Sequence, residues 1–140
     1  MAQDSDSVPL FIQDCSTFNI VSYNLHGLNS GRSLSFDLCN DSDTHIIAMQ
    51  EHGLAPRNLS VLNDIHPDFC GHGISAMHNI LATGIYKGRP FGGVGFLWRK
   101  AISEYVRIVN NDPEGRCLGI ALKTESSVTR LTAVYFQCYI

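Results

Sequence analysis

The chain has 140 residues, of which 44% are hydrophobic, and 10 Lys and Arg against 13 Asp and Glu give it a formal net charge of −3. This length predicts one domain at most, with a core that buries roughly two thirds of the unfolded surface. The five cysteines are odd in number and irregularly spaced, which argues against a disulfide framework. The N-terminal segment lacks the features of a secretion signal, and no stretch approaches the length of a membrane span. We therefore expect an intracellular protein, nuclear or cytoplasmic, without a membrane partner.

Charge is divided unevenly along the chain. Residues 1–83 hold 2 basic and 9 acidic side chains, a net −7, whereas residues 84–140 hold 8 basic and 4 acidic ones, a net +4. An acidic end suited to a metal ion beside a basic end suited to phosphate is compatible with a protein that cuts a polyanion. Ordinary variation of surface charge would give the same imbalance.

The first elements are predicted from composition and spacing. Residues 1–17 are largely polar and aperiodic, and we expect them to form a flexible arm. Residues 18–25 are rich in β-branched and aromatic side chains and predict a strand. Residues 32–41 place Leu34 and Leu38 one turn apart, which predicts a short helix.

The next predicted elements are short and apolar. Residues 46–50 are uniformly apolar up to Gln50 and too few for a helix, so they predict a central strand. Residues 56–65 predict a short helix that Pro67 ends. Residues 74–77 predict a further short strand.

After Gly84 the sequence alternates between strand-like runs and turns. The predicted strands cover residues 94–98, 105–109, 117–123 and 130–136, and their short connections predict an antiparallel meander. In residues 117–123 large apolar side chains alternate with small ones. This strand should therefore turn a bulky face toward a second sheet.

Two oxygen-bearing side chains follow the first two central runs. Residues 20–27 and 46–53 each consist of an apolar run, a polar residue and then Gly, with Asn24 and Glu51 at the polar positions. The carboxyl ends of neighbouring parallel strands meet at one sheet edge, where α/β proteins bind ligands. An amide oxygen and a carboxylate suit Mg²⁺ or Mn²⁺ better than a soft metal. An exposed loop carboxylate and ordinary turn chemistry at the Asn remain as alternatives.

A zinc site is a weaker interpretation of the His and Cys residues between His66 and His78. Their spacing contains no C-x₂-C pair and matches no familiar finger, so we expect no zinc. The Gly-rich run at 92–95 is not a dinucleotide-binding fingerprint, since no helix opens after it.

Three motifs together resemble a known superfamily. S-Y-N-L-H-G-L at 22–28, I-I-A-M-Q-E-H at 46–52 and G-R-P-F-G-G-V-G-F-L-W at 88–98 are similar to the opening motifs of the endonuclease/exonuclease/phosphatase superfamily, which has the DNase I-like fold. The likeness extends over residues 18–140, with V-Y-F at 134–136. Within the superfamily, the sequence most resembles endonuclease domains of non-LTR (LINE-type) retrotransposons, which are associated with a reverse transcriptase.

The resemblance implies the fold class. It is an α/β (α+β) sandwich of two mixed β-sheets flanked by helices, and residues 18–140 would form its N-terminal half. The G-D-x-N and S-D-H motifs of the second half do not occur in these 140 residues.

The resemblance also implies roles for individual residues. Asn24 and Glu51 would hold Mg²⁺ or Mn²⁺. Tyr135 falls where relatives carry a catalytic Tyr-x-Pro motif, whose phenol can donate a hydrogen bond to the scissile phosphate. Here Gln137 replaces the Pro, which leaves the loop geometry open, and an aromatic strand in the sheet core is the alternative interpretation.

Basic residues are the expected phosphate contacts. Arg116 resembles a family position that anchors the active-site side of the sheet, and a surface Arg is the alternative. Arg99 and Lys100 remain as further basic residues that could meet the phosphates of DNA.

The function implied is that of a truncated Mg²⁺-dependent DNase I-like endonuclease that is inactive alone, because the His and Asp that would activate water belong to the missing motifs. The expected partners are DNA and either the missing C-terminal half or a second copy of the chain. A non-catalytic remnant or binding fragment is one alternative. A phosphatase of the same superfamily acting on lipid or nucleotide phosphates is another.

Overall fold

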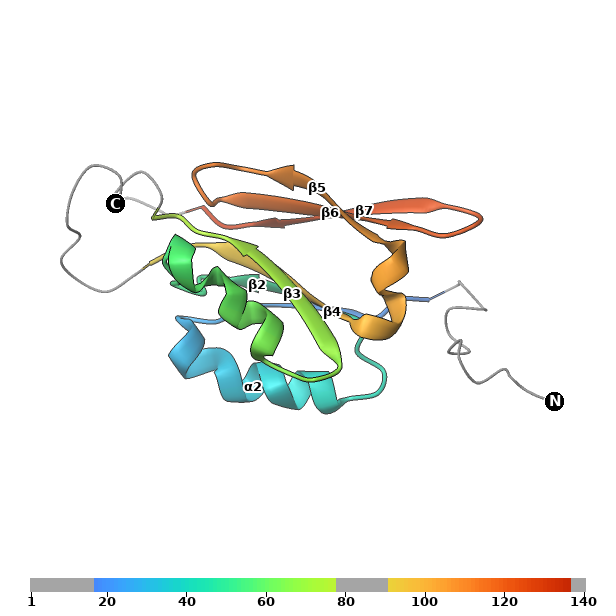
Figure 1. Ribbon diagram of the computed structural model, residues 1–140, viewed down its shortest axis with the longest axis horizontal. Coiled ribbons are helices and arrows are strands. Elements are labelled where there is room, and N and C mark those ends of the chain that lie inside the picture. Colours follow the sequence, from blue (N-terminus) through green and yellow to red (C-terminus); the bar gives the residue numbers. More distant parts are fainter. Residues whose placement is uncertain (1–16, 78–90, 137–140) are drawn as a thin grey trace.

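The computed structural model describes residues 17–77 and 91–136, so most of the arm predicted over 1–17 lies outside these residues. Within them the chain forms three layers, in which a second sheet stacks on a first sheet and helices cover the first sheet's other face (Figure 1). With η denoting a 3₁₀ helix, the elements in chain order are β1 (Ile20–Asn24), α2 (Leu28–Asn40), β2 (Ile46–Gln50), η2 (Pro56–Asp64), β3 (Phe69–Ile74), β4 (Val94–Arg99), η3 (Lys100–Tyr105), β5 (Val106–Asn111), β6 (Cys117–Lys123) and β7 (Val128–Val134).

The strands form two sheets, as the resemblance implied. The first has the order β1-β2-β4-β3, with β1 parallel to β2 and the other pairs antiparallel. The second, β5-β6-β7, is antiparallel throughout, so only the first of the two sheets is mixed in the described part of the chain.

The predicted four-strand meander is correct only for β5, β6 and β7. Strand β4 instead inserts between β2 and β3 of the first sheet. Its side chains explain this position, because Phe96 packs into the core between the sheets while Leu97 packs into the core beneath the helices. A strand that is apolar on both faces gains most from a central place in the sheet.

Strand β2 is also buried on both faces. Ile46 and Ala48 belong to the core between the sheets, whereas Ile47 and Met49 belong to the core under α2 and η2. This explains why the run reads as uniformly apolar, and its predicted bounds are confirmed.

Strand β6 confirms the predicted division into a bulky and a thin face. Leu118, Ile120 and Leu122 are each at most 2% exposed and pack against the first sheet. The interdigitation of these side chains with those of β2 and β4 holds the two sheets together.

The predicted helix at 32–41 is longer than expected and turns a different face inward. It begins at Leu28, and Leu34 is 51% exposed. The buried face carries the small residues Gly31 and Ser35, and a Cβ at Gly31 would overlap the side chain of Leu25. Small residues let the helix approach the sheet closely, but they are invisible to a search for large apolar side chains.

The strand predicted at 74–77 lies earlier in the chain, as β3. Its inward positions include Phe69, Gly71 and Gly73, and two of these three carry no side chain to reveal the alternation. A Cβ at Gly71 would overlap the carbonyl of Leu62, so η2 can lie directly against this strand.

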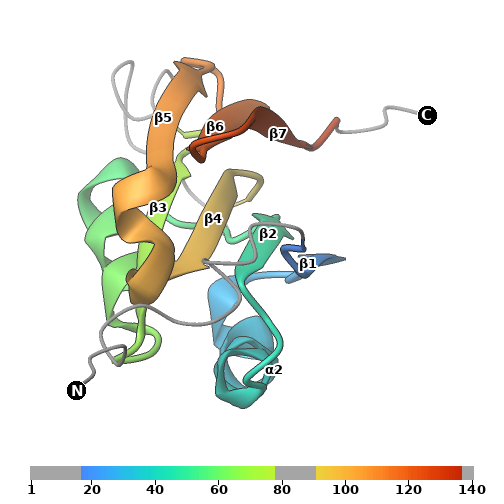
Figure 2. The same cartoon turned by 90° about the vertical axis from the view of Figure 1, so that its right-hand side faces the viewer.

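Four strands, β1 and β3 in the first sheet and β5 and β7 in the second, are edge strands within the described residues. Figure 2 shows two of these edge strands, β1 and β7, on the same side of the molecule. Exposed apolar residues accompany them, since Ile20 is 43% exposed and Val128 56%. Across residues 17–77 and 91–136, every helix is too short or too polar to cross a membrane.

We expect isolated residues 1–140 to self-associate, because unprotected sheet edges pair with other chains. Size-exclusion chromatography with light scattering should show species larger than a monomer. Val128→Lys combined with Thr132→Lys, both on exposed positions of β7, should shift the protein toward monomer. A monomer at all concentrations with one steep urea transition would contradict this expectation.

Candidate metal and phosphate site

Asn24 and Glu51 lie side by side at one end of the first sheet, where the parallel strands β1 and β2 both finish; we call this end the Glu51 edge. Asn24 is the last residue of β1, Glu51 directly follows β2, and the parallel register pairs Asn24 with Gln50. Backbone bonds continue the pairing past the strands, from the Leu25 N–H to the Gln50 carbonyl and from the Gly27 N–H to the Glu51 carbonyl, each 2.8 Å. The predicted neighbouring strands are confirmed, although β1 is a partly exposed edge strand and not a buried one.

Two residues at this edge have a strained backbone. His26 (φ 52°) and Glu51 (φ 58°) are the non-glycine residues with positive φ in the part of the chain that the structure describes. Left-handed conformations of such residues cost on the order of 1–3 kcal/mol and concentrate at functional sites. Both lie at this edge, which singles it out from the rest of the described fold.

The side chains of these residues converge. The Asn24 Oδ1 accepts a 2.8 Å hydrogen bond from the His26 backbone N–H, and the His26 Nδ1 lies 3.7 Å from the Glu51 Oε2. The side chain of Glu51 is 28% exposed, so its carboxylate reaches solvent. An amide oxygen with a second lone pair and an accessible carboxylate are the hard oxygen donors that Mg²⁺ or Mn²⁺ requires.

These donors alone would leave a cation incompletely coordinated. No cluster of three or more His, Cys, Asp or Glu suited to a metal occurs among residues 17–77 and 91–136. Magnesium typically keeps several waters and uses one or two carboxylates plus substrate phosphate, so the pair fits such an ion without a closed protein cage.

Tyr135 reaches the same edge from the second sheet. It follows β7, its backbone N–H donates to the Arg116 carbonyl at 2.9 Å, and its phenol lies near enough to the Glu51 carboxylate for that charge to act on it. Burial raises the pKa of the Tyr135 phenol, and the charge of Glu51 raises it further. The phenol therefore stays protonated as a donor, while its ring packs at the margin of the core between the sheets.

Arg116 lies nearby, but its charge is already paired. Its guanidinium contacts Asp112, with Nε 3.4 Å from Oδ2, and forms an ion pair with Glu114. Its backbone carbonyl fixes Tyr135, so it anchors this side of the sheet through the main chain. A phosphate would have to compete with two carboxylates for the side chain.

The structure does not bring Arg99 and Lys100 to this edge. Because β4 runs antiparallel to β2, Arg99 lies beside His45 at the opposite end, about 20 Å from Glu51 at roughly 3.3 Å per residue. The Arg99 guanidinium donates to the carbonyls of Cys39, Asp41 and Thr44 and stacks 4.5 Å above the Phe69 ring centroid. It therefore secures the end of α2, and nothing in this geometry supports a phosphate contact.

His52, the residue after Glu51, is buried and held by two hydrogen bonds, which the sequence did not reveal. It is 1% exposed; its Nδ1 accepts from the Leu54 N–H at 2.9 Å, so its Nε2–H donates to the Ile74 carbonyl at 2.8 Å. Gly93 lies against the ring with φ 87°, and a Cβ there would overlap it. Burial lowers the pKa of His52 to about 4, so the imidazole is neutral.

The sequence also did not predict that His26 belongs to the site, because an exposed His in a turn gives no signal in the sequence.

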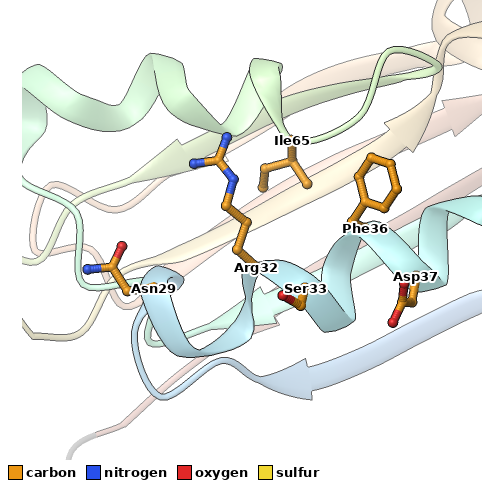
Figure 3. Close-up of a pocket in the computed structure, with 6 residues that line it drawn as sticks. All are labelled: Asn29, Arg32, Ser33, Phe36, Asp37 and Ile65. Carbon is orange, nitrogen blue, oxygen red and sulfur yellow. The ribbon is translucent and has the colours of Figure 1, made fainter.

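A surface groove lies elsewhere, between α2 and η2. Its volume is about 400 Å³, and Figure 3 shows Arg32 and Phe36 rising from α2 toward Ile65. The residues that line it are Asn29, Arg32, Ser33, Phe36, Asp37 and Ile65. None of the site residues described above belongs to this groove.

Comparison with solved structures identifies the architecture. The chain is similar to a 3′ phosphatase, NExo from Neisseria bound to a product DNA hairpin, with 18% identity and a TM-score of 0.53 over 85% of this chain and 41% of that chain. It is also similar to a 3′-5′ exonuclease, NExo from Neisseria meningitidis, with 18% identity and a TM-score of 0.50 over 83% of this chain and 40% of that chain. No protein-family model and no curated protein matches the sequence.

These similarities establish the fold. The chain has part of a DNase I-like fold, built from two sheets with helices, and spans about two fifths of the length of the structures that it matches.

The strain at Glu51 yields a test of its function. We expect Glu51→Gly to leave the free energy of unfolding unchanged or to raise it by about 1 kcal/mol, because glycine adopts positive φ without penalty. The same variant should lose metal binding, measured by calorimetric titration. Glu51→Ala, which keeps the strain, is the matched control and should be less stable than Glu51→Gly. A large loss of stability in Glu51→Gly would show that the carboxylate is structural.

The buried His52 predicts a loss of stability in acid. Its pKa falls from about 6.5 in the unfolded chain to about 4 in the folded one, so below pH 6.5 protons bind preferentially to the unfolded state. The free energy of unfolding should therefore fall by up to about 3 kcal/mol as the pH drops from 6.5 to 4. Urea titrations in EDTA should show a flatter profile for His52→Gln, whereas His72→Gln on β3 should keep the slope of the natural chain.

Proposed function

We propose that the chain supplies the metal- and phosphate-binding half of a DNase I-like phosphodiester hydrolase that acts on DNA, of the type found in non-LTR retrotransposons. The supporting observation is the convergence of Asn24, Glu51 and Tyr135 at one edge shared by both sheets, with Glu51 held in a strained conformation. The DNase I-like fold and the DNA hairpin bound by one similar structure agree with this proposal.

Each residue of the site has a defined task. Glu51, with the amide oxygen of Asn24, would hold Mg²⁺ or Mn²⁺, which when bound neutralises charge developing on a phosphate. The Tyr135 hydroxyl is a protonated donor beside Glu51 that can turn to a phosphate oxygen. Arg116 positions Tyr135 through its backbone carbonyl.

The S-D-H motif, which by resemblance would supply the acid–base group, does not occur in this sequence. His52 cannot activate water, because both of its ring nitrogens are hydrogen-bonded to the backbone inside the protein. The second half of a DNase I-like domain, in the same polypeptide or another, would supply that group. This division of labour makes residues 1–140 a partial enzyme.

Hydrolysis of a phosphomonoester at a DNA 3′ end is the second candidate. The similar structures are described as a 3′ phosphatase and as a 3′-5′ exonuclease, so one fold serves both reactions. Glu51, Asn24 and Tyr135 would contact phosphate in either case, and the assays must therefore include both substrates.

We expect isolated residues 1–140 to show no turnover with Mg²⁺ or Mn²⁺ on supercoiled plasmid or on a 3′-phosphorylated DNA hairpin. Missing acid–base and phosphate groups each remove a factor on the order of a hundred or more. The metal should still bind, and Glu51→Gln should weaken its binding by tenfold or more in calorimetry. Lys100→Ala, at the far end of the sheet, should bind metal as the natural chain does.

Two results would contradict the proposal. Metal binding that survives Glu51→Gln would remove the metal site. Robust cleavage that disappears in Glu51→Ala would show that these 140 residues assemble a complete site, and cleavage that persists in Glu51→Ala would identify a contaminating nuclease.

A further inference from the structure

His26 is placed beside Glu51 by a conformation that an ordinary turn residue does not need. It has φ 52°, lies between the end of β1 and the start of α2, and its side chain is 77% exposed. An exposed imidazole gains little from burial, so packing of the side chain does not offset the backbone strain. The backbone N–H bond to the Asn24 Oδ1 fixes the turn and orients the residue at the site.

The distance between His26 and Glu51 is informative. The 3.7 Å between Nδ1 and Oε2 exceeds the length of a hydrogen bond. It is close to the separation of about 3.0–3.4 Å expected for adjacent ligands of one ion when each bond is about 2.1 Å long. A shift of a few tenths of an ångström would let both atoms contact the same metal.

We propose that His26 is a third ligand at the Asn24–Glu51 site and that its nitrogen gives the site a preference for Mn²⁺ and Co²⁺ over Mg²⁺. This inference rests on the metal site of the proposed function. Two oxygen donors alone suit Mg²⁺, whereas imidazole suits first-row transition metals, whose affinity for a mixed nitrogen and oxygen site rises from Mn²⁺ to Co²⁺.

The surroundings are compatible with this donor set. Glu51 contributes a negative charge, the Tyr135 phenol lies near that carboxylate, and the nearby Arg116 is already paired with Asp112 and Glu114. The cationic side chain of Arg116 is thus held by carboxylates and does not replace the metal at Glu51. Three donors from this chain leave coordination positions open for water and phosphate.

The test compares the natural chain with His26→Asn and Glu51→Gln. Asn tolerates positive φ, so His26→Asn exchanges the nitrogen donor for an oxygen donor without changing the backbone conformation. His72→Asn, on β3, is the matched control. Dissociation constants for Co²⁺, Mn²⁺ and Mg²⁺ are measured by titration, and pulsed electron paramagnetic resonance of bound Mn²⁺ detects a directly coordinated nitrogen.

We expect the natural chain and His72→Asn to bind Co²⁺ most tightly and Mg²⁺ most weakly, with a nitrogen signal on Mn²⁺. His26→Asn should lose the nitrogen signal and about tenfold or more of its Co²⁺ affinity, while its Mg²⁺ affinity changes by less than about twofold. An unchanged metal preference in His26→Asn, or a natural chain without the nitrogen signal, would overturn the inference while Glu51-dependent binding upheld the proposed function. Metal binding indifferent to Glu51→Gln, or no binding at all, would overturn both.

Discussion

The parallel pairing of β1 with β2 is the constraint on which the rest of the structure depends. Parallel strands require a crossover, and α2 provides it, packed on the face of the sheet away from the second sheet. The register then brings Asn24 beside Gln50 and delivers Glu51 just past the strand end. Backbone bonds beyond both strands fix the turn that carries His26. A shift of this register by one residue would separate the donors and expose the apolar faces of β2.

The second sheet completes the site through packing. Leu118, Ile120 and Leu122 hold β6 against the first sheet, and β7, paired with β6, is followed directly by Tyr135 near Glu51. The site therefore depends on contact between layers that are distant in sequence. A change that weakened the core between the sheets would also displace the phenol from the carboxylate.

Neither Arg99 nor Arg116, the two predicted phosphate-binding arginines of the basic half, offers an unpaired charge at the Asn24–Glu51 site. Arg99, in the basic half, secures the end of α2 at the opposite end of the sheet, and Arg116 is held by Asp112 and Glu114. Net charge counts side chains along the chain, whereas a phosphate responds to the few unpaired charges within about a Debye length. The number of basic residues in the second half of the chain therefore did not correctly predict that Arg99 lies far from the site or that the Arg116 side chain is paired.

The sequence by itself determined β2, β6, the pairing of β1 with β2 and the shared edge of Asn24 and Glu51, because these features follow from local apolar patterns that end in polar residues and glycine. Tertiary structure decided the rest. The buried face of α2 and the true position of β3 depend on Gly31, Ser35, Gly71 and Gly73, whose small side chains carry no hydrophobic signal. The insertion of β4, the burial of His52 and the approach of His26 and Tyr135 to Glu51 depend on contacts between segments far apart in the chain, which no local pattern records.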